Sequence, residues 1–311
     1  MDEPCRISVI VLVDHYATIR RVAEHLCAQT VAKDIELVIA CPRATEFDVP
    51  AAVAHTLARV TVVEIPLLPM GPARAAAVKA ASAPIVVLGE THAFPARDWA
   101  ERLVGALEGP WEAVAPGLEN GNPDTARSWS AFLMDYGRYL AELTVGEIDE
   151  PPAYNAAWKR EALLGFDDRM PLMLEPGAPL HTELAGTGAH FYREPNARVA
   201  HLNVARPVAA WAAERYWGGR LFGARRSREW SLPRRLVYFS GSVLVPLIRF
   251  VRTRTAASLA GRGRDLPAGT LAAVAGGSLL WGFGEALGYV AGEGRAEARM
   301  LEYELHKERY A

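Results

Sequence analysis

The first 116 residues predict an α/β fold with a mostly parallel sheet and flanking helices. Two observations indicate this fold: short runs rich in Val, Ile and Leu alternate with longer stretches, and the apolar residues of those stretches recur at helical spacing. The whole chain has 311 residues, of which 50% are hydrophobic and 23% are charged. This composition excludes a disordered or collagen-like polymer.

The strands of this part are expected wherever a short apolar run is bounded by turn-forming residues. They are placed at 7–13, 35–41, 60–65, 85–88 and 113–115. Helices are expected between them at 17–29, 73–81 and 96–107. Gly71 permits a sharp entry into the second of these helices, and Pro72 suits a first helical turn because its missing N–H has no partner there anyway.

From about residue 119 to 201 the periodicity weakens, and Pro, Gly and Asn accumulate. Such a composition is typical of long functional loops. Helices are still expected at 126–140 and 180–188, with a short strand at 189–192.

The charge of the chain is divided unevenly along its length. Residues 206–264 contain 13 Arg and two Glu, with no Lys or Asp, although the formal net charge of the whole chain is only −2. The sequence therefore predicts two domains: an acidic α/β domain over 1–205, and an Arg-rich, amphipathic and apolar helical region over 206–311. An Arg-rich region in an otherwise acidic chain indicates an anionic partner, either a membrane surface or nucleic acid.

Two apolar segments in the second domain favour the membrane over nucleic acid. They cover 237–251 and 268–292, and the second is long enough to cross a bilayer. Arginines flank both segments, as expected beside an anionic cytoplasmic leaflet. Gly284, Gly288 and Gly292 have the spacing that lets helices approach closely. The alternative is a pair of buried helices in a soluble domain, because Glu285 and the glycines weaken a spanning segment.

The location expected from the sequence is the cytoplasmic membrane, with the first domain facing the cytoplasm. The polar start Met1–Arg6 does not have the character of a secretory signal. Cys5, Cys27 and Cys41 match neither a paired metal site nor a disulfide framework, which indicates a reducing compartment.

The most informative chemical pattern follows the apolar run at 85–88. Glu90 and His92 stand there two residues apart, at what is expected to be the carboxyl end of a strand, where α/β sheets bind their ligands. In extended geometry they project the same way, so they can offer a carboxylate oxygen and an imidazole nitrogen to one divalent cation. The alternative is a hydrogen-bonded loop histidine beside a solvated glutamate. The sequence has no phosphate-loop, dinucleotide-binding, zincin or nucleophile-elbow motif, which weakens those enzyme classes.

Several segments resemble the family 2 glycosyltransferases of the GT-A fold, over about residues 6–205. They are Ile7-Ser-Val-Ile-Val-Leu-Val13, Leu26-Cys-Ala-Gln-Thr30, Ile35-Glu-Leu-Val-Ile39, Gly71-Pro-Ala-Arg-Ala-Ala-Ala77, Ala83-Pro-Ile-Val-Val-Leu88 and Pro95-Ala-Arg-Asp-Trp99. In that family an Asp-x-Asp element at the end of this strand binds Mg²⁺ or Mn²⁺ and the donor diphosphate. Glu90-Thr-His92 occupies the corresponding place, as a Glu-x-His variant.

The resemblance also implies roles for residues elsewhere in the chain. His201 matches a strand-end histidine near the metal or the diphosphate, and the alternative is a structural histidine with satisfied hydrogen bonds. Glu183 corresponds to the catalytic base, with Glu175 and His181 as further candidates for that role. The groups that would contact the donor are Asp14, Arg74, Lys159 and Arg160, of which Lys159 and Arg160 lie in the family-like segment Asn155-Ala-Ala-Trp-Lys-Arg-Glu161. The alternative for Lys159 and Arg160 is a salt bridge with Glu161 at the start of a helix.

The activity implied is transfer of a sugar, with inversion, from a nucleotide-sugar donor to a lipid-linked or glycan acceptor at the membrane. Two departures from the family pattern bear on this expectation. The second strand runs into Ala40-Cys-Pro-Arg43 where the family has an Asp-Asp-Gly-Ser-like element, and Thr91 replaces a carboxylate. They support an alternative, a degenerate member that binds nucleotide sugar or glycan as a scaffold in a polysaccharide assembly complex. A nucleotidyltransferase on a related sheet fits less well, because no Gly-rich basic loop follows the first strand.

Overall fold

The computed structural model describes residues 5–311, except for the side chains of Glu46 and Arg264. It divides into two compact units. The first comprises 5–119, 141–175 and 179–200, and the second comprises 120–140, 176–178 and 201–311. Residues 120–140 thus belong with the C-terminal helices, although 141–175 and 179–200 belong to the first unit.

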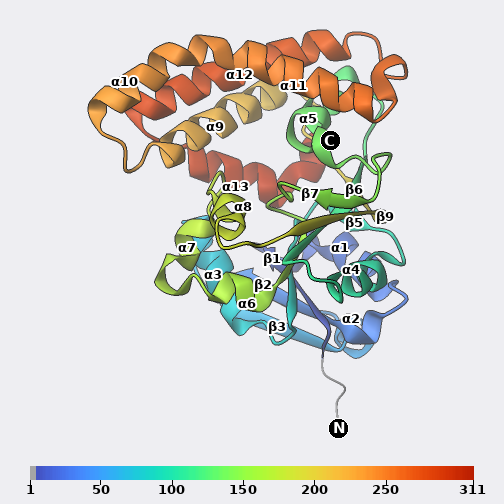
Figure 1. Cartoon of the computed structure of the whole chain (residues 1–311). Coiled ribbons are helices and arrows are strands. Elements are labelled where there is room, and N and C mark those ends of the chain that lie inside the picture. The colour runs from blue at the N-terminus through green and yellow to red at the C-terminus, as the bar shows by residue number, and fades with distance from the viewer. Residues whose placement is uncertain (1–4) are drawn as a thin grey trace. The chain divides into compact units, whose positions relative to one another are not determined.

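The first unit is built on one mixed sheet with the strand order β3-β2-β1-β4-β8-β6-β9-β5, and β7 pairs with β9 (Figure 1). Its strands are β1 Ile7–Leu12, β2 Ile35–Cys41, β3 Arg59–Glu64, β4 Ile85–Leu88, β5 Ala93–Pro95, β6 Ala113–Asn120, β7 Gly146–Ile148, β8 Ala157–Lys159 and β9 Phe191–His201. Strands β1 to β4 are mutually parallel, as the sequence predicts. Strand β8 runs antiparallel to both β4 and β6, so the second half of the sheet is mixed.

Helices cover both faces of this sheet (Figure 1). They are α1 Arg20–Cys27, α2 Ala51–Thr56, α3 Met70–Ala80, α4 Trp99–Leu107, α6 Arg160–Leu164, α7 Met170–Met173 and α8 Leu180–Ala185. Successive residues of a strand point to opposite faces. Accordingly Ile10 packs with the core that includes α3, whereas Val9 shares a small space with Val22 of α1 and Trp99 of α4.

The expected elements are present with shifted bounds. The helix expected at 17–29 is a short 3₁₀ turn followed by α1, and α3 begins at Met70, which leaves Pro72 within the first turn. The strand expected at 189–192 extends to His201 as β9, and that expected at 113–115 extends to Asn120 as β6. The short strands β5, β7 and β8 and the helix α2 are not predicted from the sequence, because each is too short to show a period.

A buried carboxylate joins the amino ends of three strands. Glu36 of β2 is 0% exposed and accepts hydrogen bonds from the hydroxyls of Ser8 at 2.6 Å and Thr61 at 2.8 Å, and from the backbone N–H of Ser82 at 2.7 Å. Burial opposes ionisation, but these donors hold the pKa of Glu36 below its usual range. The carboxylate therefore stabilises the fold at the edge of the sheet opposite to Glu90.

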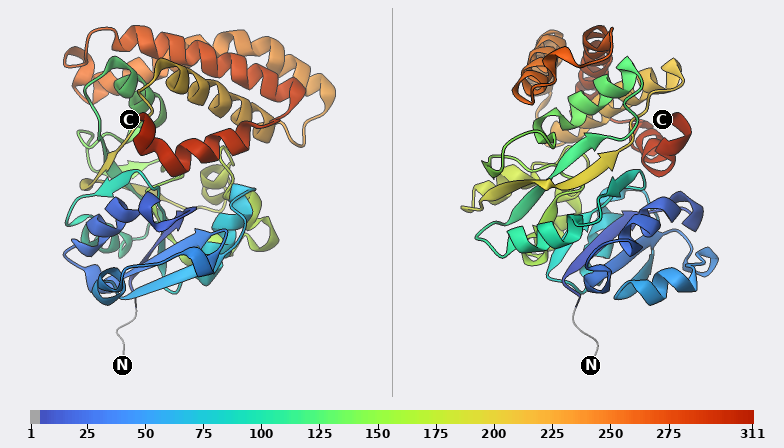
Figure 2. Two further views of the ribbon diagram at one scale, coloured as in Figure 1. Left: turned by 180° about the vertical axis from the view of Figure 1, so that it is seen from behind. Right: turned by 90° about the vertical axis from the view of Figure 1, so that its right-hand side faces the viewer.

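The second unit is helical. Its helices are α5 Ala126–Tyr136, α9 Val208–Arg226, α10 Leu232–Gly241, α11 Val245–Leu259, α12 Thr270–Ala291 and α13 Ala296–His306. Glycines let α9 and α12 approach backbone to backbone: a Cβ on Gly284 would lie 2.1 Å from the carbonyl oxygen of Tyr216, and one on Gly219 would lie 2.2 Å from that of Trp281. Figure 2 shows these long helices side by side.

Two helical segments of this unit are long and apolar enough to cross a membrane by length and composition. Leu232–Leu259 has a mean hydropathy of 1.3 and is 11% buried over its most apolar window, and Thr270–Ala291 has values of 1.2 and 39%. The second corresponds to the segment expected at 268–292. The first is longer than the segment expected at 237–251, because α10, a 3₁₀ turn at Ser242–Leu244 and α11 form one nearly continuous run.

Candidate metal and donor site

Glu90 and His92 lie directly after β4, at the carboxyl edge of the parallel strands. Both are buried, with Glu90 6% exposed and His92 0% exposed. His92 Nε2 lies 3.5 Å from Glu90 Oε1, and its Nδ1 lies 3.3 Å from the hydroxyl oxygen of Thr91. The side chains therefore face each other, although the chain turns at 91–92 and is not extended there, and Glu90 is not a solvated surface residue.

Asn155 holds the Glu90 carboxylate from the other side. Its side-chain amide donates to Glu90 Oε2 at 2.6 Å, and its backbone N–H donates to the carbonyl of Leu88 at 2.9 Å. Asn155 is 3% exposed and has φ = 64°, a left-handed conformation that costs a non-glycine residue free energy. Strain of this kind persists where the surroundings hold it, often at functional sites. In the sequence Asn155 stands out only as part of a motif, and the tolerance of asparagine for positive φ is the one signal that singles it out.

His201 is the last residue of β9, and the division between the two units falls immediately before it. Strand β9 pairs with β5, which begins one residue after His92, and the N–H of Ala96 donates to the carbonyl of Arg198 at 2.9 Å. The strand thus carries its final residue to the edge of the sheet that Glu90 and His92 occupy. The potential ligand atoms of Glu90, His92 and His201 all lie within 4.8 Å of one another.

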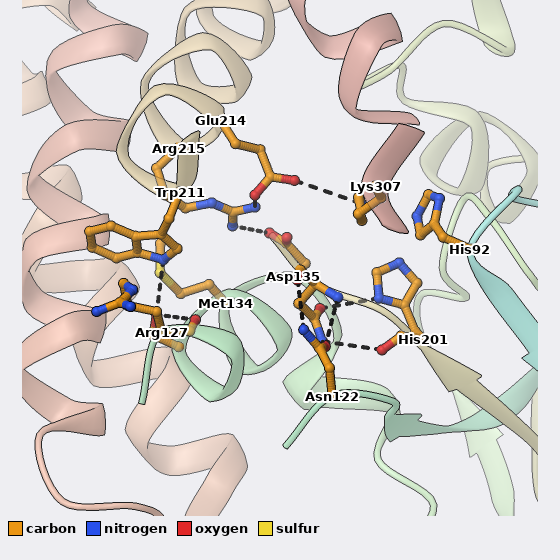
Figure 3. A network of polar contacts seen from close by, with 12 residues as sticks. His92, Asn122, Arg127, Met134, Asp135, His201, Trp211, Glu214, Arg215 and Lys307 are labelled. Atoms are coloured by element: carbon orange, nitrogen blue, oxygen red, sulfur yellow. Dashed lines mark hydrogen bonds and ion pairs between the residues drawn. The ribbon is translucent and has the colours of Figure 1, made fainter. Parts of the chain in front are cut away.

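Hydrogen bonds fix the orientation of the His201 ring (Figure 3). Asn203 donates its side-chain amide to Asn120 Oδ1 at 3.0 Å and to the His201 carbonyl at 3.1 Å, so its amide oxygen faces His201 Nδ1 at 3.1 Å. This oxygen accepts from Nδ1–H, which places the ring's lone pair on Nε2. Tyr136 packs against the ring at 4.6 Å between centroids. Fixing a tautomer in this way is how proteins orient metal-binding histidines.

The donor set is suited to a divalent transition metal. One carboxylate and two imidazoles offer an oxygen and two nitrogens, whereas Mg²⁺ binds oxygen ligands almost exclusively. The residues present therefore fit a divalent cation that accepts nitrogen as well as oxygen ligands.

Two of the predicted donor-contacting residues lie at this same edge. Asp14 follows β1, the parallel neighbour of β4, and its carboxylate accepts from the hydroxyl of Thr18 at 2.7 Å. Arg74 lies in the first turns of α3, which starts at this edge after β3. Its guanidinium is 4.5 Å from the ring of Tyr154, the residue before Asn155, and donates to the carbonyl of Leu174 at 3.1 Å.

The other two predicted donor residues lie elsewhere. Because β8 runs antiparallel to β4, Lys159 lies opposite Ile85, at the amino end of β4 and away from Glu90. Lys159 forms an ion pair with Glu112 at 3.2 Å. Arg160 donates to the carbonyls of Val78 and Lys79, both at 2.9 Å, and so satisfies the C-terminal end of α3. The structure thus gives both residues structural partners and does not bring them to the cluster.

The three candidates for the catalytic base lie in and between α7 and α8. Glu183 accepts from Arg169 at 3.0 Å, and His181 lies 3.6 Å from Glu150. Glu175 packs on the start of α3, where a Cβ on Gly71 would lie 2.7 Å from its Cγ. Glu183 and His181 are partly exposed, as a group that receives an acceptor proton needs to be.

An ionic network around the buried Arg215 lies within the second unit (Figure 3). Arg215 of α9 donates to Asp135 of α5 at 2.8 Å and to Glu214 at 2.8 Å, and Lys307 lies 3.7 Å from Glu214. Arg215 holds the pKa of the Asp135 carboxyl below its usual range. Burial disfavours a charged Arg215, yet the two carboxylates keep its pKa above the ordinary value. The network ties α5, α9 and the C-terminal residues together.

No family model and no curated protein matches the sequence. Among solved structures the chain is similar to the mannosyltransferase PcManGT from Pyrobaculum calidifontis, determined in complex with GDP-Man and Mn²⁺. The identity is 19% and the TM-score is 0.49, over 98% of this chain and 90% of the other. At this level of similarity, the chemistry of this chain has to be argued from its own residues.

Proposed function

We propose that this chain is an inverting glycosyltransferase of the GT-A type, which uses a nucleotide-sugar donor and a lipid-linked or cell-surface glycan acceptor at the cytoplasmic face of a membrane. The observation that carries the proposal is the buried cluster of Glu90, His92 and His201 at the carboxyl edge of the sheet. Ligands of α/β sheets bind at this edge. The motifs that resemble family 2 glycosyltransferases place the donor diphosphate there.

Glu90, His92 and His201 would hold the divalent metal, a cation that accepts nitrogen as well as oxygen ligands. When bound, the metal supplies positive charge that stabilises the departing nucleoside diphosphate. Asp14 contacts the nucleoside in this proposal, because it follows the strand adjacent to β4. Arg74 adds positive charge at the start of α3.

Glu183 is proposed as the base that takes the proton from the acceptor hydroxyl, which then attacks the anomeric carbon in line with the leaving diphosphate. Glu175 and His181 are the other candidates. A single displacement of this kind inverts the anomeric configuration. The Arg-rich helical region would hold the catalytic domain at an anionic membrane, not on nucleic acid.

The test is a panel of nucleoside diphosphate sugars incubated with Mn²⁺, in which binding is measured by calorimetry and turnover by release of the nucleoside diphosphate. We expect turnover with at least one donor, and a loss of about 10²–10³-fold in the Glu90→Ala and His92→Ala variants. The matched controls are Glu147→Ala and His190→Ala, which break an exposed Glu–His pair at 2.6 Å on the same sheet.

The outcomes separate the two candidate functions. Wild-type rates in both cluster variants would exclude the assignment. Donor binding without turnover would instead support the scaffold, which Thr91 and the missing Asp-Asp-Gly-Ser-like element favour.

A further inference from the structure

The run formed by α10 and α11 exposes many large apolar side chains along its middle. Of the 17 exposed large hydrophobic side chains among the described residues, ten lie in Leu232–Leu259 and four more lie in α12. The most exposed in the middle of the run are Val243 at 78%, Leu244 at 55% and Leu247 at 62%. Patches this continuous mark a surface that contacts something other than water.

The inward side of the same run carries charge. The guanidinium of Arg249 lies 4.0 Å from the ring of Trp281 on α12 and 3.5 Å from the carbonyl of Met134 on α5. A surface helix of a water-soluble domain places its polar residues outward and its apolar residues inward. The middle of the α10–α11 run, from 236 to 251, does the reverse, so its outward face there is suited to an apolar solvent.

We propose that the second unit binds an anionic lipid bilayer through this outward face and lies in the membrane interface without crossing it. We call the face the outward apolar surface and define it by Leu236, Val243, Leu244, Leu247 and Val251. Helix α12 also exposes Leu279 and Phe283. The proposal refines the membrane attachment that forms part of the proposed function, and it rests on that part alone. It does not depend on sugar transfer.

Helix α12 is held along α9, which is too polar to enter a bilayer. The glycines of α12 contact the backbone of α9 directly: a Cβ on Gly288 would lie 2.4 Å from the carbonyl oxygen of Arg220. Arg225 of α9 pairs with Glu293 and Glu297 beyond the end of α12, both at 2.7 Å. The charged residues of α9 are Glu214, Arg215, Arg220, Arg225 and Arg226. Moving α12 alone into the hydrocarbon would break these contacts and expose buried charge.

The α10–α11 run also lies along α12 (Figure 1). A Cβ on Gly282 of α12 would lie 3.0 Å from the ring of Pro246 in α11. Because the run is packed on its inner side and exposed on its outer side, it is suited to lie on a membrane surface and not to cross the bilayer. Interfacial helices bury only their apolar face, about 5–10 Å deep.

The charged residues around the outward apolar surface favour binding to a membrane leaflet that contains anionic lipids. Between residues 230 and 264 the chain contains seven Arg and no Asp or Glu. Arg234 lies at one end of the run and Arg252 and Arg254 lie near the other, all exposed. Basic side chains at both ends of an apolar face are attracted to acidic headgroups when that face is inserted.

The test uses the full chain and two kinds of vesicle, one of phosphatidylcholine alone and one that also contains phosphatidylglycerol. We expect co-sedimentation with the anionic vesicles, at least about tenfold weaker in the Val243→Asp variant, because an inserted Val side chain accounts for about that change in a binding constant. Val208→Asp is the matched control, since Val208 is 55% exposed at the start of α9, outside the surface. Alkaline carbonate should release the bound protein, whereas a spanning helix would remain.

Three results would overturn the proposal: carbonate-resistant binding, unchanged binding of the Val243→Asp variant, or equal binding to both kinds of vesicle. A concentration-dependent dimer that Val243→Asp disrupts, without any vesicle binding, would identify a second copy as the occupant and also overturn it. Donor binding and turnover in detergent-free solution should be unchanged in Val243→Asp. Loss of membrane binding is thus distinguishable from failure of the proposed enzymatic function.

Discussion

The substitution Asn155→Gly tests whether Asn155 positions Glu90 for metal binding. Glycine adopts φ = 64° without strain, so the backbone can stay as it is while the hydrogen bond from the Asn155 amide to Glu90 Oε2 is lost. At 2.6 Å between buried groups this is a charge-assisted bond, worth about 1.5–3 kcal/mol. Loss of such a support to a metal ligand typically costs about 10–100-fold in affinity. We therefore expect Mn²⁺ affinity to fall by that factor.

The measurement is Mn²⁺ binding to the protein alone, by electron paramagnetic resonance of the free ion, together with thermal unfolding by circular dichroism. The Asn155→Ala variant loses the same bond but keeps the left-handed backbone. It should bind Mn²⁺ as weakly as Asn155→Gly. It should also be less stable than Asn155→Gly by about 1 kcal/mol, and so unfold at a lower temperature. Asn196→Gly, at an exposed site on β9, is the control. Wild-type Mn²⁺ affinity in Asn155→Gly would refute the positioning role.

Further predictions concern stability, measured by guanidinium unfolding. Glu36→Gln should cost about 1–3 kcal/mol at neutral pH. The pKa of Glu36 is lower in the folded state than in the unfolded state, so the charged carboxylate stabilises the fold. This stabilisation is complete above the unfolded pKa of about 4.3 and is lost as the pH falls through the folded pKa. The difference in unfolding free energy between Glu36→Gln and wild type should therefore shrink in acid. Arg215→Ala should cost about 3–5 kcal/mol, because it leaves the buried Glu214 without its closest cation. Gly284→Ala should destabilise by about 1–3 kcal/mol, since its Cβ would meet a backbone carbonyl of α9, whereas Gly276→Ala in the same helix meets only an ordinary contact at 3.7 Å and should be neutral or stabilising.

The parallel half of the sheet follows from the sequence, because hydrophobic period and turn residues are local signals. The runs at 7–13, 35–41 and 85–88 become β1, β2 and β4 with shifts of at most one residue. The position of Glu90 and His92 follows as well, since carboxyl ends of parallel strands meet at one edge whatever their order.

Residues whose position depends on long-range pairing could not be placed in this way. Lys159 stands four residues after Asn155 in the same motif, yet β8 carries the two toward opposite ends of β4, because it runs antiparallel. The left-handed backbone of Asn155 and its bond to Glu90, 65 residues away, depend on the same pairing. Local periodicity likewise does not predict that residues 120–140 pack with the C-terminal helices.

The composition of the cluster also has an electrostatic consequence for the donor. Glu90 is its only carboxylate, since Thr91 stands where a second acid would add negative charge. A divalent cation held by one carboxylate and two neutral imidazoles keeps a formal positive charge, whereas two carboxylates would cancel it. In a buried site with a low effective dielectric, that remaining charge attracts a diphosphate strongly. The Thr91→Asp variant should therefore bind Mn²⁺ more tightly and a nucleoside diphosphate more weakly, and calorimetry that finds both affinities raised would contradict this reasoning.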